Sequence, residues 1–140
     1  MADKLCEISA EDYTAVYELW QHCDGLGGLE NQEQFVRFVD RNRGLSVTVR
    51  DDENILGALM CGHDGRRGYL YHLAVHPDAR GRGLARLMID SCLAKLNDLQ
   101  IQRCTVFVKK DNIRGLEFWL HNGWWKRSDL DACAFDLVIN

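Results

Sequence analysis

A strand, a glycine-rich turn and an amphipathic helix follow one another without interruption from residue 69 to residue 99, and this succession constrains the fold most. Residues 69–76 have the aromatic and aliphatic content of a strand, and Pro77 ends it. Apolar side chains recur at helical spacing from Gly83 onward, and residues 102–109 return to strand alternation. Because a strand, a helix and a second strand in this order connect parallel neighbours, the segment predicts a sheet with a parallel pair.

Helix and strand signals alternate along the whole chain in the predicted order β-α-α-β-β-β-α-β-α-β-β. The expected strands are 4–8, 45–50, 55–61, 69–76 and 102–109, with a closing hairpin of 124–127 and 134–139. The expected helices are one capped by Ser9 and running through Cys23, one over about 30–41, one over 83–99, and one from Asp111 or Asn112 through His121. The chain has one proline and no internal repeat, so we expect a single domain over residues 1–140.

Composition favours a soluble globular domain. The chain has 140 residues, of which 46% are hydrophobic and 27% charged, and its formal net charge is -4. An acidic balance does not favour nucleic-acid binding, which needs basic groups to neutralise phosphates. No apolar stretch approaches the length of a membrane span, and the first residues lack the apolar core of a signal peptide. We therefore expect a cytoplasmic protein that binds neither nucleic acid nor membrane.

The six cysteines are scattered and form no C-x-x-C pair. No histidine stands at metal-ligand spacing from any of them, so no metal site is predicted. Most lie among apolar residues, where a reduced thiol packs like a small hydrophobic group.

The turn between the strand and the helix suits a phosphate group. Backbone N–H groups at a helix start have no intrahelical acceptor, and glycines let an anion approach them. Arg80 and Arg82 add positive charge there. The same residues could instead form only a tight solvated turn. No Gly-Lys-Ser/Thr follows and the glycine spacing does not fit a dinucleotide fingerprint, so a nucleoside triphosphate and NAD are disfavoured.

These residues resemble the GNAT superfamily of N-acetyltransferases. Its acyl-CoA motif is Arg/Gln-x-x-Gly-x-Gly/Ala after a strand with an apolar-x-Val-x-Pro ending, which corresponds to Leu73–Ala85 here. A second family signature, Asn-x-x-Ala/Gly-x-x-Phe-Tyr followed by Gly-Phe, has counterparts at matching spacing. They are Asn112, Gly115, Phe118, Trp119, Gly123 and Trp124.

The resemblance implies an α/β (α+β) fold of the GNAT type: a mixed seven-stranded sheet flanked by four helices. Two neighbouring central strands, here 69–76 and 102–109, would diverge in a V-shaped splay that admits acyl-CoA. It also implies acetyl transfer from acetyl-CoA, as acyl-donor cosubstrate, to a primary amine of a small molecule or peptide. The amine would attack directly in a ternary complex, without a covalent enzyme intermediate.

By this resemblance, two groups of residues bind the cofactor. Backbone groups of the strand segment Leu73, Ala74 and Val75 pair with the pantetheine arm, as an added strand does at a sheet edge. The pyrophosphate is held by the turn and helix start, which comprise Arg80, Gly81, Arg82, Gly83, Leu84 and Ala85. Asn112 contacts the CoA arm, although a plain helix cap is an equal interpretation. Trp119 packs against the CoA arm.

The catalytic groups are less defined, because the chain departs from the family pattern twice. Many members have a Glu at the position of Tyr69, and most have a proton-donating Tyr at the position of Trp119, whose indole cannot practically supply a proton. Tyr69 and Tyr71 share one face by alternation and are the candidate catalytic residues. Alternation places His72 on the opposite face, where a structural role is favoured. His63 and Asp64 at the preceding turn stay undecided.

The acceptor is expected to bind near residues 24–30, an acidic and glycine-rich segment that could act as a lid. Its charge favours a cationic amine, although an ordinary surface loop is an equal interpretation. The departures at Tyr69 and Trp119 leave an alternative function, a catalytically impaired acyl-CoA-binding module. Trp125 could lie at a homodimer surface, so the oligomeric state stays open.

Overall fold

The computed structural model describes residues 3–52 and 54–139. They divide into two compact units, residues 1–107 and 108–140, which are described separately below. Among the described residues, no helix combines the length and apolar character needed to cross a membrane.

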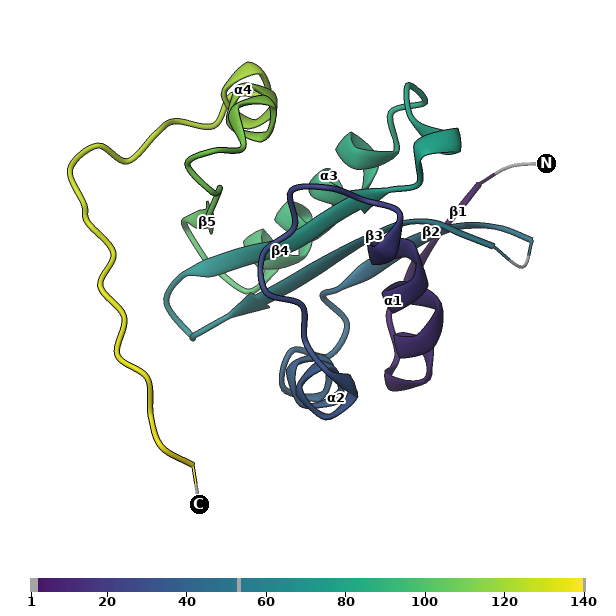
Figure 1. The fold of residues 1–140 in the computed structure, drawn as a ribbon, viewed down its shortest axis with the longest axis horizontal. Coiled ribbons are helices and arrows are strands. Elements are labelled where there is room, and N and C mark those ends of the chain that lie inside the picture. The colour runs from purple at the N-terminus through teal and green to yellow at the C-terminus, as the bar shows by residue number, and fades with distance from the viewer. Residues whose placement is uncertain (1–2, 53, 140) are drawn as a thin grey trace. The chain divides into compact units, whose positions relative to one another are not determined.

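The first unit is a five-stranded mixed sheet with three α-helices (Figure 1). Its strands are β1 (Lys4–Glu7), β2 (Val47–Asp51), β3 (Asn54–His63), β4 (Gly68–Val75) and β5 (Cys104–Val106). Its helices are α1 (Tyr13–Gln21), α2 (Gln32–Arg41) and α3 (Leu84–Asp98). The strands lie in the order β1-β2-β3-β4-β5, in which the first four pair antiparallel and β4 pairs with β5 in parallel. The predicted crossover through α3 and the mixed sheet are confirmed.

Alternation along β3 separates the two faces of the sheet. Ala58 and Met60 join the apolar cluster formed with α1 and α2. Gly57 faces α3 instead, since a Cβ at that position would lie 2.8 Å from Cε of Met88. Helices α1 and α2 therefore cover one face and α3 covers the other (Figure 1).

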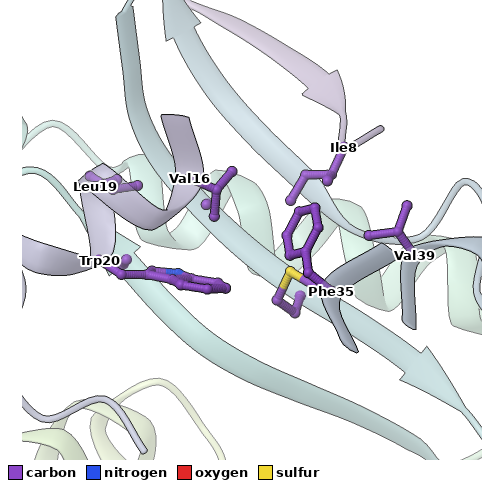
Figure 2. Close-up of a cluster of buried hydrophobic side chains, with 9 residues drawn as sticks. Ile8, Val16, Leu19, Trp20, Phe35 and Val39 are labelled. Carbon is purple, nitrogen blue, oxygen red and sulfur yellow. The ribbon is translucent and has the colours of Figure 1, made fainter. Parts of the chain in front are cut away.

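The cluster between α1, α2 and the sheet fixes the face on which the candidate catalytic residues lie. Figure 2 shows Val16, Leu19 and Trp20 of α1 in one cluster with Phe35 and Val39 of α2, with the Trp20 ring extending toward Phe35. All five side chains are buried, and the ring centroids of Trp20 and Phe35 are 6.1 Å apart with their planes nearly perpendicular. Burying side chains of this size contributes roughly 1.5–3 kcal/mol each.

Strands β4 and β5 stay paired over only three positions, Gly68 with Cys104, Tyr69 with Thr105 and Leu70 with Val106. From Tyr71 onward β4 has no partner on that side among the described residues. The V-shaped splay that the resemblance implied for the two strands stays a prediction.

The second unit holds α4 (Ile113–His121) and an extended C-terminal segment. Gly123, with φ of +91°, ends the helix, and the N–H of Trp124 donates to the carbonyl of Trp119 at 3.1 Å. The four predicted helices are thus present in the described chain.

The predicted hairpin of 124–127 and 134–139 is wrong, because the described residues of both segments form no strand; the sheet has five strands, not seven. Phe135, Val138 and Ile139 are each more than 80% exposed. An alternating pattern gives a strand only where another strand supplies a hydrogen-bonding ladder. No such ladder forms in this segment.

Candidate active site

A β-bulge in β4 sets the geometry of the site. In the pairing of β3 with β4, Ala58 lies opposite Ala74 and Met60 opposite Tyr71. One residue of β3 therefore faces two of β4, His72 and Leu73, and His72 has a φ of +54°. A residue inserted in this way leaves the ladder and reverses the alternation after it.

The reversal can be followed along β4. Before the bulge, Gly68 faces α3, because a Cβ there would lie 2.6 Å from Cδ1 of Leu96. After the bulge, Ala74 packs into the cluster with α1 and α2 although it also has an even number. The prediction that His72 lies opposite Tyr69 and Tyr71 is therefore wrong. Period-two alternation assumes a regular ladder, and the bulge breaks it.

His72 instead lies beside α1 and the segment before α2. Its Nε2 is 2.8 Å from Oε2 of Glu30, and only 7% of its side chain is exposed, against 28% for Glu30. Its ring meets Trp20 edge-on at 5.1 Å between centroids. Sequence analysis missed this pair because the partners are 42 residues apart and the bulge has no local sequence signature.

The segment that carries Glu30 is anchored at its end. The hydroxyl of Tyr13 donates to the Glu30 carbonyl at 3.1 Å. The next residue, Asn31, caps α2 by accepting the N–H of Gln34 at 2.9 Å. Leu29 packs against the apolar cluster. The carboxylate that contacts His72 of β4 is thereby held in place.

Tyr69 and Tyr71 lie on the same face of the sheet, as predicted. Together with Phe107 they form a row of stacked rings, called the aromatic ladder below. The ring centroids of the two tyrosines are 6.2 Å apart and their ring planes differ by 19°. Tyr69 also stacks on Phe107, with 6.0 Å between ring centroids and 10° between ring planes. Phe38 of α2 meets Tyr71 edge-on. Burial, reinforced by Tyr69, raises the pKa of Tyr71. Its phenol therefore stays protonated at neutral pH and can donate a proton.

The turn between β4 and α3 has the conformation that an anion site requires. Gly81 and Gly83 have φ of +79° and +76°, and a Cβ at either would meet no atom within 4 Å. Gly83 is the N-cap of α3, and no side chain caps the helix. The N–H of Leu87 donates to the Gly83 carbonyl at 3.0 Å. The start of a helix is where backbone N–H groups can bind an anion.

The two arginines of the turn are held differently. Nε of Arg80 donates to the Val75 carbonyl at 3.2 Å, and Sγ of Cys23 lies 3.6 Å from the same oxygen. Arg82 makes a looser ion pair with Asp3 at 3.7 Å. Arg80 thus braces the end of β4, while Arg82 is half exposed and adds charge near the helix start.

His63 and Asp64 serve the turn between β3 and β4. Oδ1 of Asp64 accepts the N–H groups of Arg66 and Arg67 at 2.8 and 2.7 Å, and these bonds lower the pKa of Asp64. Nδ1 of His63 accepts the N–H of Gly65. Both side chains therefore act as turn caps.

In the second unit, Asn112 caps α4, with its Oδ1 accepting the N–H of Gly115 at 2.9 Å. Trp119 is buried and meets Trp124 edge-on at 4.7 Å between centroids. The described residues contain no cluster of three or more His, Cys, Asp or Glu side chains able to hold a metal ion.

Comparison with known proteins identifies this arrangement. The model of the acetyltransferase (GNAT) family matches residues 3–124. The chain belongs to this family. An acetyltransferase of Yersinia pestis is 35% identical over 103 residues, which cover 73% of both chains, and one of Pectobacterium atrosepticum has the same identity and coverage. The chain is therefore an N-acetyltransferase of the GNAT type.

Solved structures share its fold. The PaiA N-acetyltransferase of Thermoplasma acidophilum, solved in complex with coenzyme A, superposes with a TM-score of 0.80. It is 17% identical and the alignment covers 94% of each chain. Ard1 of Thermoplasma volcanium has a TM-score of 0.77 at 17% identity, over 88% of this chain and 82% of its own.

Proposed function

We propose that this acetyltransferase transfers an acetyl group from acetyl-CoA to a primary amine of a small molecule or peptide by direct attack in a ternary complex. The observation that carries the proposal is the edge of β4 that has no partner strand after Leu70 among the described residues. Its parallel pairing with β5 stops at Leu70, and the same strand is followed by the glycine turn, at which α3 begins without a side-chain cap. An extended polar chain and a pyrophosphate fit these two features in sequence.

The donor is held mainly by backbone groups. Leu73, Ala74 and Val75 lie on the length of β4 that has no pairing with β5, and backbone groups on that edge can pair with the amides of the pantetheine arm. The turn residues Arg80–Ala85 offer N–H donors and the charge of Arg82 to the pyrophosphate. Asn112 and Trp119 are assigned to the cofactor by the family resemblance alone and stay predictions.

The chemistry requires three events at the thioester. A neutral amine attacks the carbonyl carbon, a backbone N–H near Val75 stabilises the oxyanion, and the CoA thiolate leaves. Tyr71 is the proposed proton donor to the thiolate, with Tyr69 as the second candidate, because the indole N–H of Trp119 is too weak an acid to give up its proton. The raised pKa of Tyr71 keeps this donor protonated.

The acceptor is proposed to lie on the aromatic ladder. Phe107, at one end of the ladder, is 66% exposed, and the side chain of Glu30 is 28% exposed. Aromatic faces and a carboxylate together attract an ammonium group. Proteins of similar fold include a ribosomal-protein-alanine N-acetyltransferase of Brucella and an aminoglycoside acetyltransferase from a soil sample. Enzymes named for a protein acceptor and for a small-molecule acceptor therefore both have this fold.

A catalytically impaired acyl-CoA-binding module is the second candidate. Two observations favour it: Trp119 replaces the usual tyrosine, and β4 carries no carboxylate. It predicts CoA binding without turnover. The cytoplasmic location, the single domain over residues 1–140 and a homodimer remain predictions.

The deciding experiment is acetyl transfer from acetyl-CoA to a mixed panel of amino acids, polyamines, aminoglycosides and short peptides, read as product mass. Mass detection avoids thiol dyes, which would react with the free cysteines. An acceptor heavier by one acetyl group, formed faster than without protein, supports the transferase. CoA binding by calorimetry with no product from any acceptor supports the binding module.

A further inference from the structure

The bulge residue of β4 is buried against an acidic partner beside the proposed thioester site. His72 is followed directly by Leu73, where the proposed pantetheine contacts begin. Its Nε2 lies 2.8 Å from the Glu30 carboxylate, which therefore accepts a hydrogen bond from Nε2–H. Nδ1, the other ring nitrogen, forms no hydrogen bond with any of residues 3–52 and 54–139. The imidazole is thus oriented with one basic nitrogen available.

His72 adopts a left-handed backbone conformation at the bulge of β4. A φ of +54° is rare for a residue with a side chain, and such residues concentrate at functional sites. The surroundings also hold the ring: Trp20 contacts it from α1, and Glu30 is fixed through Tyr13 and the α2 cap.

We propose that His72 is the general base that takes a proton from the acceptor amine, directly or through one water molecule, and that Glu30 is its positioning residue. This proposal rests on the proposed function. A carboxylate on one imidazole nitrogen fixes the tautomer and stabilises the imidazolium that forms when the other nitrogen gains a proton. It also supplies the base that no carboxylate on β4 provides.

The proton balance is complete without a further reactant. The ammonium of the acceptor gives one proton to Nδ1 of His72, and the neutral amine then attacks the thioester carbon to form the N–C bond. The C–S bond breaks with its electron pair on sulfur. The nitrogen of the new amide loses its second proton to that thiolate, through Tyr71 if the tyrosine acts as proposed. The imidazolium returns its proton to water.

Few other ionisable groups surround this imidazole. Tyr71 precedes it on β4, Glu30 approaches from the segment before α2, and Tyr13 reaches the same segment from α1. Trp20 is the ring that α1 presents to it. Glu30 is thus the acidic group among these neighbours, and its removal tests the electrostatic part of the proposal.

Three variants test the pair on the best acceptor from the panel. His72→Asn removes the base but keeps a residue that tolerates positive φ. His72→Gly also permits this φ and leaves a cavity that added imidazole can fill. Glu30→Gln keeps a hydrogen-bond acceptor but removes the charge. Glu33→Gln is the matched control, because that exposed carboxylate, paired with Arg37, lies three residues further on.

We expect His72→Asn and His72→Gly to lower kcat by about 10²–10⁴, and Glu30→Gln to lower it less, while CoA affinity and Tm change little. Imidazole is expected to restore part of the His72→Gly activity. The wild-type kcat/KM is expected to depend less on pH than that of His72→Asn, because the base takes the proton of the amine. In His72→Asn, kcat/KM keeps rising about tenfold per pH unit toward the amine pKa near 10. A merely structural role would produce neither the rescue nor the altered profile.

The outcomes separate the two proposals. A wild type that binds CoA but acetylates no amine refutes the proposed function and the base together. A wild type that acetylates an amine while His72→Asn keeps its rate and pH profile refutes only the base. Loss of activity in Glu30→Gln with full activity in His72→Asn would make Glu30 the direct base and overturn the assignment to His72.

Discussion

Two glycines in different turns provide a controlled test of the pyrophosphate site. Gly83 and Gly65 have φ of +76° and +89°, and a Cβ at either would meet no atom within 4 Å. Alanine therefore strains the backbone in both turns without a steric clash. Gly83 begins α3 beside the proposed anion site, whereas Gly65 lies in the turn between β3 and β4.

The expected stability losses are similar. Placing an alanine in the left-handed region costs roughly 1–2 kcal/mol, and stiffening the unfolded chain returns about 0.4–1 kcal/mol of this. Each variant should therefore lose about 1 kcal/mol, or about 3 °C in Tm for a chain of this size. Gly83→Ala should lose a few tenths more, because alanine is a poorer N-cap than glycine.

Their CoA affinities should differ sharply. A methyl group at Gly83 occupies the open space through which a phosphate reaches the helix N–H groups. Losing one hydrogen bond to a charged phosphate costs about 1.5–3 kcal/mol, which raises Kd about 10- to 150-fold. Gly65→Ala should leave Kd unchanged.

The assay is isothermal titration of each variant with CoA, paired with thermal unfolding. If both variants bound CoA as the wild type does, the turn before α3 would not be the pyrophosphate site. If both lost affinity equally, the effect would come from destabilisation, and the assignment of the turn would fail as well.

Four further outcomes are expected. Tyr71→Phe should lower kcat more than Tyr69→Phe while leaving CoA affinity intact; equal and unchanged rates would remove both from the mechanism. Phe107→Ala should raise KM for a cationic acceptor several-fold with little effect on kcat, because this exposed ring only extends the ladder. Phe35→Ala, at a fully buried position, should cost about 3–5 kcal/mol in urea unfolding. Burial raises the pKa of Cys104 to about 12, so at pH 8 only about one thiol in 10⁴ is thiolate. Alkylation followed by peptide mass analysis should label exposed Cys133 first.

Local signals in the sequence were sufficient to predict most elements of the first unit. The periodicity of Leu84, Met88 and Cys92 predicted α3, and the glycines before it predicted the turn. The first four strands were predicted to within a few residues, because each lies between turn or breaker residues that act locally. The strand expected over 102–109 is shorter, Cys104–Val106, because its length depends on how far β4 stays beside it.

The C-terminal hairpin shows where pattern alone fails. Residues 124–127 and 134–139 have strand-like composition, yet they form no strand in the described chain. Strand-like composition indicates that a segment can form a strand when a partner strand lies beside it. It does not indicate whether that partner is present.

One part of the candidate site could be predicted from the sequence and another part could not. The glycine turn could be identified from the sequence, because helix starts and positive-φ glycines are set by neighbouring residues. The position of His72 could not, since a bulge is a mismatch between two strands, and only the pairing of Ala58 with Ala74 and of Met60 with Tyr71 reveals it. By itself the sequence determined the order of elements through α4, the glycine turn before α3 and the family. Tertiary structure alone decided which face His72 occupies and brought Glu30 to it, because register and contacts between distant residues depend on the whole sheet.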